Sequence, residues 1–484
     1  MAKSSSNSIP SPKGTRDLYP DDLLRQRYIT EAWRRVSIRH GFEEIAGPTF
    51  EMLDLYKKKS GEGIVSELFS FTRAGGDDDY ALRPEFTPTL ARMYAAKANA
   101  LPSPCKWFTA GPYFRAEKPQ RGRLREFLQW NCDVIGDADT ADGSLLAVAI
   151  EGMRELGLTP SDVSAHLMSR PLLAEELNRI GVNEKLHAAT FSLIDAAPKI
   201  SREGLVERGR AIGLADPVIS AIAHMGGAVV PFVGCTGIGT IGTSDPFAEA
   251  IYNKNHTIEM YWEFDDEPEF GIYYESIDVG IHEWCKFDPR IARGLAYYTG
   301  TVFELIADGE RAVAGGGRYD NLIELFGGPP TPAVGFGMGD VVLGLLLEDK
   351  GLMPEGPALM DALSQKPASL RPEAFVIANE AGEAQIEPLL AKLRRGVESE
   401  AWISRGDKKP WDADRYDVPP MHARRSYKST KNIGKLLADA RKQHAKFAVI
   451  IDSGEVAKVE NLDTREDVGT FPLDQVGAKI AERL

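Results

Sequence analysis

Residues 111–136, GPYFRAEKPQRGRLREFLQWNCDVIG, constrain the fold of this chain more than any other stretch. The run KWFTAGPYF, which leads to Arg115, predicts a strand, and the run EFLQWNCDVIG, from Glu126, predicts its antiparallel return. The intervening KPQRGRLR is too polar and too flexible to belong to a core. The sequence therefore predicts a long hairpin with a charged loop.

The hairpin loop carries four guanidinium groups within eleven residues, at positions 115, 121, 123 and 125. Packed arginines repel one another unless a phosphate or carboxylate lies among them. The loop therefore indicates an anionic ligand. A solvated surface loop is the alternative, because charge runs usually face water.

The composition is that of an ordinary soluble globular protein. With 484 residues, 43% of them hydrophobic and 26% charged, the chain has enough material for two or three domains. No apolar run approaches the roughly 18 residues that a membrane helix needs, so no membrane partner is expected. The polar N-terminus, MAKSSSNSIPSPKG, predicts a disordered lead-in and not a signal peptide.

The four cysteines, Cys105, Cys132, Cys235 and Cys285, are scattered without paired spacing. This pattern favours a reducing, cytoplasmic location and argues against a disulfide framework or a zinc site. The eight histidines also lack metal-ligand spacing. The sequence therefore predicts no metal site built by the protein.

The formal net charge of −14 argues against a nucleic-acid partner, because such proteins usually carry a basic surface. The charge is uneven, however. Residues 401–450 contain twelve Lys or Arg against five acidic residues. This basic window could attract a polyanion, or it could be a solvated helix face.

Periodic patterns outside the hairpin predict further elements. A helix is expected over residues 21–40, followed by a strand broken at Gly47-Pro48. Another helix is expected over residues 86–99, with Thr87 as its N-cap. A third follows the hairpin at about residues 142–157.

The character of the chain changes after the third helix. Residues 171–226 are helical and rich in alanine and leucine, which indicates an inserted domain ending near Trp284. Its glycine-rich segment GGAVVPFVGCTGIGTIG lacks the Lys-Ser/Thr pair of a P-loop. Near the C-terminus, FVIAN, IEPLLAKLRRGVESE, NIGKLLADARKQH and KFAVIID alternate as an α/β domain. The predicted parts are a lead-in (1–10), a main domain (11–169 and 285–350), an insertion (170–284), a linker (351–371) and a C-terminal domain (372–484).

The segment LRPEFT places Glu85 and Thr87 just ahead of a predicted helix. A carboxylate and a hydroxyl there can receive an ammonium group. Helix capping is the alternative, and for Thr87 both can hold.

The hairpin resembles motif 2 of the class II aminoacyl-tRNA synthetases, and most closely that of the histidyl-tRNA synthetases, FR-x-E-x-PQ-x-GR-x-R-x-F-x-Q. The positions that fit are Arg115, Glu117, Pro119, Gln120, Gly122, Arg123, Arg125, Phe127 and Gln129. The resemblance implies an ATP-binding loop with Arg115, Glu117 and Arg123 as ligands. It also implies that Glu85, Thr87 and Gln129 hold the α-amino group of the amino acid.

The segment ARGLAYYTGTVFE resembles a histidyl signature, usually RGLDYYTG-x-VFE. The resemblance implies that Arg293 joins Arg115 in neutralising the α-phosphate and also contacts histidine. It further implies that Tyr298 and Asp133 hydrogen-bond the imidazole, since phenol and carboxylate groups suit a ring with two nitrogens, and that Tyr297 also belongs to the histidine-binding residues. Ala296 stands where the signature usually has aspartate.

Two glycine-rich segments complete the resemblance. AGGGRYDNLIELFGG resembles the second histidyl signature, although a tight glycine turn is an alternative. TPAVGFGMGDVVLG aligns with motif 3, G-x-G-x-G-x-ER, but has Val341-Val342 in place of Glu-Arg. That arginine ordinarily contacts the ATP γ-phosphate, and Arg123 is our candidate to replace it.

The resemblance covers about residues 10–350 well. It implies an α+β catalytic domain with an antiparallel sheet, a helical insertion and a C-terminal α/β anticodon-binding-like domain. The implied function is a cytoplasmic histidine–tRNA ligase that uses ATP with Mg²⁺, histidine and tRNA(His), as a homodimer built around motif 1 at Pro48. The alternative is a non-catalytic paralogue that regulates ATP phosphoribosyltransferase in histidine biosynthesis. Another class II specificity fails on the two histidyl signatures.

Overall fold

The fold is described from a computed structural model of the chain. The described residues are 9–60, 62–138, 141–224, 229–231, 239–241, 260–262, 271–292, 297–307, 312–363, 369, 371–406, 408–410, 412, 414–428, 430–452 and 454–484.

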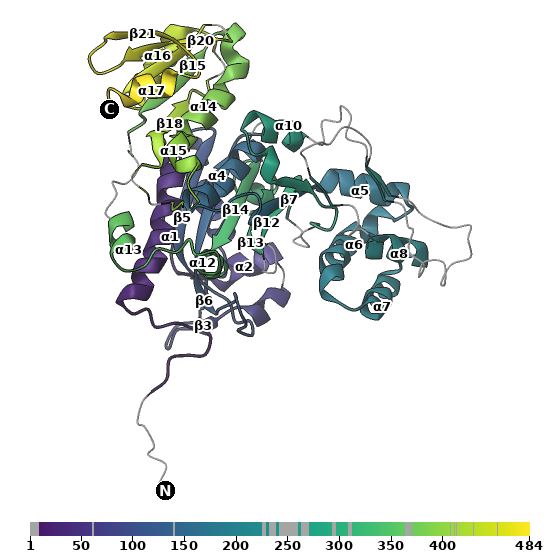
Figure 1. Ribbon diagram of the computed structural model, residues 1–484. Coiled ribbons are helices and arrows are strands. Elements are labelled where there is room, and N and C mark those ends of the chain that lie inside the picture. Colours follow the sequence, from purple (N-terminus) through teal and green to yellow (C-terminus); the bar gives the residue numbers. More distant parts are fainter. Residues whose placement is uncertain are drawn as a thin grey trace.

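A nine-stranded sheet forms the centre of the described chain (Figure 1). Most of its strands come from the segments before and after the insertion. All neighbouring pairs are antiparallel except β1–β5 and β7–β11. The strands, in their order across the sheet, are β1 (Glu43–Glu44), β5 (Cys105–Phe114), β6 (Glu126–Ile135), β14 (Ala333–Gly339), β13 (Ala312–Arg318), β12 (Thr301–Ala307), β7 (Val163–Ser169), β11 (Cys285–Phe287) and β8 (Val230–Pro231). The predicted α+β fold with a largely antiparallel sheet is confirmed.

The predicted hairpin is β5 and β6. Its register pairs Cys105 with Ile135 at the base and Phe114 with Glu126 beside the loop. On its other side β6 pairs with β14, so that Asp133 lies opposite Gly335. The motif 2 hairpin and the glycine-rich motif 3 strand are therefore direct neighbours.

Among the helices that pack against this sheet are α1 (Pro20–Arg39), α4 (Ala141–Glu155) and α12 (Asp340–Asp349). Apolar side chains of α1 recur on one helical face, as expected for a helix buried along one side. On that face Trp33 stacks on Trp130 of β6, with ring centroids 5.9 Å apart. The predicted helices at 21–40 and 142–157 are confirmed. We call this sheet and its helices the main body.

The helix α3 spans Thr87–Ala95, and Phe86 is its N-cap residue. The prediction that Thr87 caps this helix is wrong, because the chain enters the helical conformation one residue earlier. Thr87 is the first helical residue, and no side-chain hydrogen bond caps the helix. The predicted break at Gly47-Pro48 is confirmed: β1 ends before it and β2 (Phe50–Met52) follows it.

The described part of the insertion is mainly helical. Helices α5 (Arg170–Arg179), α6 (Glu184–Ala196), α7 (Arg202–Ile212) and α8 (Asp216–His224) lie to one side of the main body (Figure 1). An antiparallel pair of strands, β9 (Gly239–Ile241) and β10 (Met260–Trp262), and helix α10 (Gly271–Asp278) follow. Much of the glycine-rich segment considered as a P-loop lies outside the described residues. The domain boundaries stay predictions.

The C-terminal domain is a separate five-stranded sheet, in which β18, β15 and β19 are parallel. Apolar clusters cover both faces of this sheet, which confirms the predicted α/β class. Its elements include β15 (Ala374–Ala378), α14 (Ile386–Arg395), β16 (Val397–Glu398), α15 (Glu400–Ile403), β17 (Tyr416–Val418), β18 (Ala423–Arg425), α16 (Ile433–Lys442), β19 (Phe447–Ile451), β20 (Val456–Asn461), β21 (Asp467–Pro472) and α17 (Val476–Ala481). Inside the predicted linker, α13 (Gly356–Leu363) buries Leu359 and Ala362 in the core of the main body.

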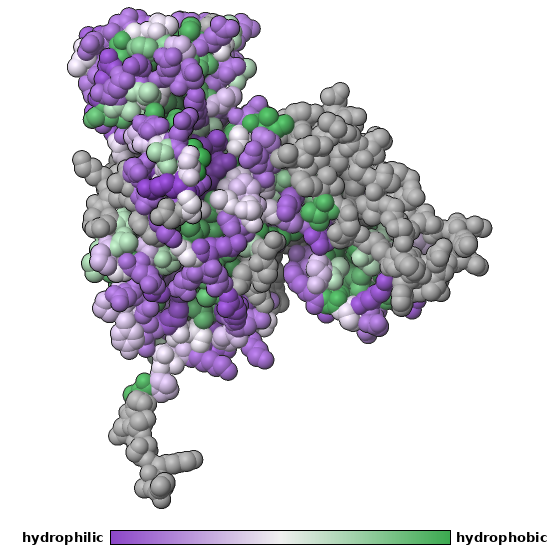
Figure 2. Space-filling view, in the orientation of Figure 1, coloured by the Kyte–Doolittle hydropathy of each residue, from purple (hydrophilic) through white to green (hydrophobic). Residues whose placement is uncertain are grey.

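Hydrophilic residues cover most of the coloured surface of the main body and the C-terminal domain in Figure 2. Within the described ranges, we find no helix with the length and apolarity needed to cross a bilayer. Cys105, Cys132 and Cys285 are buried free thiols, and Cys235 lies outside the described residues.

Candidate active site

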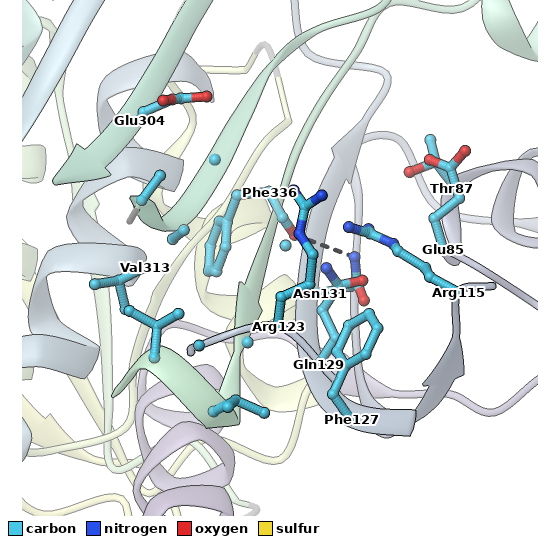
Figure 3. Close-up of a pocket in the computed structure, with 18 of the residues that line it drawn as sticks. Glu85, Thr87, Arg115, Arg123, Phe127, Gln129, Asn131, Glu304, Val313 and Phe336 are labelled. Atoms are coloured by element: carbon cyan, nitrogen blue, oxygen red, sulfur yellow. Dashed lines mark hydrogen bonds between the residues drawn. The ribbon is translucent and has the colours of Figure 1, made fainter. Parts of the chain in front are cut away.

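A cavity of about 790 Å³ opens over the nine-stranded sheet. Its walls come from β6, β13 and β14, from the start of α3 and from the motif 2 loop. In Figure 3, Glu85 and Thr87 lie beside Arg115 at one end, whereas Glu304 and Val313 lie at the other. The predicted site residues that line the cavity are Glu85, Thr87, Arg115, Arg123, Gln129, Tyr297 and Tyr298.

The arginine loop is organised by Glu117. Its carboxylate pairs with Arg123, and its backbone carbonyl accepts a hydrogen bond of 3.1 Å from Nε of Arg125. Arg121 points elsewhere and pairs with the exposed Asp349. The loop thus presents Arg123 to the cavity, and Glu117, its ion-pair partner, is not among the lining residues.

Arg115 is positioned by the end of β5. Its Nε donates to the backbone carbonyl of Pro84 at 3.2 Å, and its guanidinium lies 5.1 Å from the ring centroid of Phe127. The aromatic face supports the planar cation at the cavity wall. Arg115 is therefore held beside Glu85, as Figure 3 shows.

A buried lysine that the sequence reasoning missed contacts Glu85. Nζ of Lys59, in α2 (Leu53–Ser60), lies 2.6 Å from Oε2 of Glu85 and 3.9 Å from the ring centroid of Tyr297. The Lys59 side chain is only 1% exposed. The sequence contains one indication that Lys59 faces inward: it follows the buried Tyr56 by three residues, so that both share a helix face.

Two amide side chains of β6 present acceptors without partners. Oε1 of Gln129 and Oδ1 of Asn131 are buried and have no hydrogen-bond partner among the described residues. Nδ2 of Asn131 donates to the carbonyl of Phe336 at 3.4 Å, the dashed line of Figure 3. Unpartnered buried acceptors carry a desolvation cost that a ligand donor can offset. Asn131 was missed, although it follows Gln129 by two and so shares its strand face.

Asp133 lies just behind the cavity wall. Oη of Tyr319 donates to its Oδ1 at 2.5 Å, and burial raises the pKa of Asp133 to about 7, although this hydrogen bond opposes the rise. Asp133 is not among the lining residues, whereas Tyr319 is. A Cβ on Gly335 would collide with Oδ1 of Asp133, so glycine is needed there.

Three tyrosines therefore form the wall in front of Asp133. The ring centroids of Tyr297 and Tyr298 lie 4.5 Å apart, and those of Tyr297 and Tyr319 lie 6.3 Å apart. Sequence reasoning assigned roles to Tyr297 and Tyr298 but none to Tyr319. The sequence indication for Tyr319 was its place in the Arg318-Tyr319-Asp320 run of the second histidyl signature.

The triple glycine lies within strand β13, so the alternative of a tight turn is wrong. A Cβ on Gly316 would collide with the carbonyl of Gly335, and one on Gly317 would lie 2.5 Å from the carbonyl of Thr301. These two glycines permit close strand packing. Gly315 lines the cavity.

The end of motif 3 contributes two apolar side chains, because Val341 and Val342 line the cavity. The preceding Asp340 is buried and accepts hydrogen bonds from Arg16 at 2.6 Å and Gln26 at 2.9 Å. These contacts tie the N-terminal segment to α12.

One further basic residue and one further acidic residue line the active-site cavity. Lys199, at the end of a short turn in the insertion, and Glu304 of β12 line the cavity, and neither was given a role from sequence. Arg293 and Ala296 lie outside the described residues. In the described part of the chain, no group of three His, Cys, Asp or Glu residues could hold a metal ion.

Comparison with known proteins identifies the family of the chain. The family model described as histidyl-tRNA synthetase matches residues 14–223 and 273–339. A histidine–tRNA ligase of Halobacterium salinarum is 38% identical over 352 residues, which cover 71% of this chain and 76% of that protein. A histidine–tRNA ligase of Opitutus terrae is 37% identical over 354 residues, which cover 72% and 76%.

A solved histidyl-tRNA synthetase from Nostoc sp. PCC 7120 shares the fold. The structural match covers 99% of this chain and 100% of the Nostoc chain, with a TM-score of 0.55 and 20% sequence identity. The family-model match and the two relatives at 37–38% identity show that the chain belongs to the histidyl-tRNA synthetase family.

Proposed function

We propose that this protein is a histidine–tRNA ligase, which activates histidine with ATP and transfers the histidyl group to the 3′ end of tRNA(His). The observation that carries the proposal is the single cavity that joins Glu85, Arg115 and Gln129 with the tyrosines of the histidyl signature. Aminoacylation of tRNA(His) by the purified protein, with histidine compared against other amino acids, tests it.

Histidine fits the end of the cavity near Glu85. The carboxylate of Glu85 and the unpartnered Oε1 of Gln129 receive the α-ammonium group. Tyr298 and the hydrogen-bonded pair of Tyr319 and Asp133 face the imidazole. With a pKa near 7, Asp133 exchanges its proton close to neutral pH, which suits a ring that both donates and accepts.

ATP fits along the motif 2 loop. Arg115 and Arg293 stabilise charge that develops on the α-phosphate, Glu117 contacts adenine, and Arg123 holds the γ-phosphate in place of the missing motif 3 arginine. Mg²⁺ enters with ATP as part of the substrate. It is held chiefly by phosphate oxygens and water with one or two carboxylates, and Glu304 supplies a cavity-lining carboxylate.

The reaction needs no protein nucleophile. A carboxylate oxygen of histidine bonds to the α-phosphorus while the bond to the bridging oxygen of the β-phosphate breaks, which releases pyrophosphate. A ribose hydroxyl of the terminal tRNA nucleotide then attacks the histidyl carbonyl and releases AMP. The protein contributes positioning and fixed positive charge where negative charge accumulates.

A homodimer is part of the proposal. The small sheet of β2, β4 (Asp79–Leu82) and β3 (Ser70–Thr72) carries an aromatic cluster in which Phe50 and Tyr80 have ring centroids 5.6 Å apart. Phe50 is 51% exposed and Phe71 is 44% exposed. Such an apolar patch just after motif 1 suits an interface with a second copy. We place the protein in the cytoplasm, in keeping with its free thiols.

The alternative function is the regulatory paralogue, which the Val341-Val342 replacement would suit. The cavity nevertheless keeps Glu85 and Gln129 for histidine and Arg115 and Arg123 for ATP, and the chain carries a C-terminal α/β domain. These features favour the ligase.

A further inference from the structure

A second cavity, of about 430 Å³, lies between the main body and the C-terminal domain. The body contributes the C-terminal end of α1, β1 and the start of β5, and the C-terminal domain contributes α14, β18 and α16. In Figure 1, β18 and α14 lie next to the end of α1. None of the residues of the candidate active site lines this cavity.

The lining is strongly basic in a protein of net charge −14. Two carboxylates, Glu43 and Asp439, face six cationic side chains. The cationic residues are Lys106, Arg394, Arg424, Arg425, Lys428 and Lys442.

Only two of these cations are neutralised by ion pairs within the described residues. Arg425 pairs with Glu387 at 2.6 Å, and Lys428 pairs with Asp439 at 3.1 Å. Arg424 instead donates to neutral groups, Nε2 of His422 at 3.0 Å and the side-chain carbonyl of Gln443 at 3.3 Å. Across the described ranges, no carboxylate lies within ion-pair distance of Lys106, Arg394, Arg424 or Lys442.

Burial makes this excess charge costly. Arg394 is 6% exposed, and burial, together with the neighbouring guanidinium groups of Arg425 and Arg424, lowers its pKa against the opposing effect of Glu387. Burial and the charge of Arg394 likewise lower the pKa of His40 well below its ordinary value. Nε2 of His40 is also buried without a hydrogen-bond partner among the described residues. Desolvated like charges destabilise a fold unless an anion offsets them.

Aromatic rings fix the cationic heads at the cavity. Nζ of Lys106 lies 5.7 Å from the ring centroid of Phe42 and 5.1 Å from that of Tyr427, and the guanidinium of Arg425 lies 5.3 Å from Tyr427. Such cation–π contacts leave the N–H donors of the cations available to a ligand. Tyr427 is 38% exposed, so that its ring also borders the entrance.

We propose that this interdomain cavity binds a phosphate group. A tetrahedral oxyanion accepts several charge-assisted hydrogen bonds at once, and converging guanidinium and ammonium groups match that geometry. Two sources share this chemistry: a backbone phosphate of tRNA, and a free small phosphate. Only the tRNA source rests on the proposed function, so the site can exist even where the ligase proposal fails.

The first experiment uses inorganic phosphate as the probe and thermal unfolding of the full chain as the readout. The test variant is Lys106→Gln/Lys442→Gln, because Lys442 is exposed and Lys106 is partly exposed. The matched control is Lys392→Gln, an exposed lysine on α14 that does not line the cavity. Circular dichroism checks that both variants are folded.

Phosphate is expected to raise the Tm of the wild type and the control equally, and to raise that of the double variant much less, since a ligand stabilises only the state that binds it. An equal rise in all three proteins places phosphate elsewhere and overturns the proposal. The absence of any rise in the wild type overturns it as well.

The second experiment separates the two sources by measuring tRNA binding as a function of salt. A backbone phosphate in the cavity predicts that each lysine removed lowers the slope of log affinity against log salt by about 1. It also predicts competition between tRNA and inorganic phosphate. An unchanged slope, together with loss of the phosphate-induced Tm rise, assigns the cavity to a free phosphate.

Discussion

The ammonium group of Lys59 lies 2.6 Å from a carboxylate oxygen of Glu85, with 1% of the Lys59 side chain and 25% of the Glu85 side chain exposed. The two partners are therefore unequally desolvated. The same carboxylate is our proposed receiver of the histidine ammonium group. Lys59 fixes its orientation before the substrate arrives.

The unequal burial predicts unequal costs of mutation. Glu85→Gln removes a carboxylate charge that helps to offset the desolvation of Lys59, and we expect it to lower the free energy of unfolding by about 3–5 kcal/mol. Lys59→Met leaves a carboxylate that water can reach, so we expect it to lower the free energy of unfolding by only about 1–2 kcal/mol. Lys59→Met/Glu85→Gln should regain most of the loss. Urea unfolding of the four proteins checks this, and a larger loss in Lys59→Met than in Glu85→Gln contradicts it.

Asp133 predicts a pH dependence of stability. Its pKa is raised from 3.8 to about 7 in the folded protein, so between these values the folded state binds the proton that the unfolded state releases. Its contribution to stability therefore falls as pH rises through this window, by at most about 1.4 kcal/mol per pH unit, and levels off above it. Asp133→Asn should remove this part. The free energy of unfolding of both proteins is measured between about pH 5 and pH 8, a range that includes the pKa of Asp133. Parallel curves would exclude the raised pKa.

Tyr298→Phe tests how the imidazole is recognised. A site built to hydrogen-bond a polar side chain loses discrimination when one partner is removed. We expect the KM for histidine in ATP–pyrophosphate exchange to rise about tenfold or more, which corresponds to about 1.4 kcal/mol, with a smaller change in kcat. An unchanged KM would show that the imidazole is read by other groups.

Arg123→Ala tests the replacement for the motif 3 arginine. Because Arg123 lines the cavity, its loss should raise the KM for ATP about tenfold or more, while the KM for histidine changes little. Arg121→Ala is the matched control, since Arg121 lies two residues away, pairs with Asp349 and does not line the cavity. Equal effects of the two substitutions contradict a specific role for Arg123.

The elements that the sequence could predict are those with local signals. The β5–β6 hairpin follows from two apolar runs around a charged loop, whereas the roles of the cavity-lining Glu85, Arg115 and Gln129 follow from the resemblance to the family's motifs. Lys59 and Tyr319 were missed because their roles arise from contacts with residues far along the chain. The capping role of Thr87 failed because the helix start shifted by one residue, which local propensity does not resolve.

Histidine-dependent ATP–pyrophosphate exchange by the purified full chain tests the central claim most directly. We predict that histidine alone among the amino acids supports rapid exchange, and that Arg115→Ala abolishes most of it while histidine binding persists, because the guanidinium acts mainly where charge develops. Histidine binding by the wild type without any exchange would contradict the ligase and favour the regulatory paralogue.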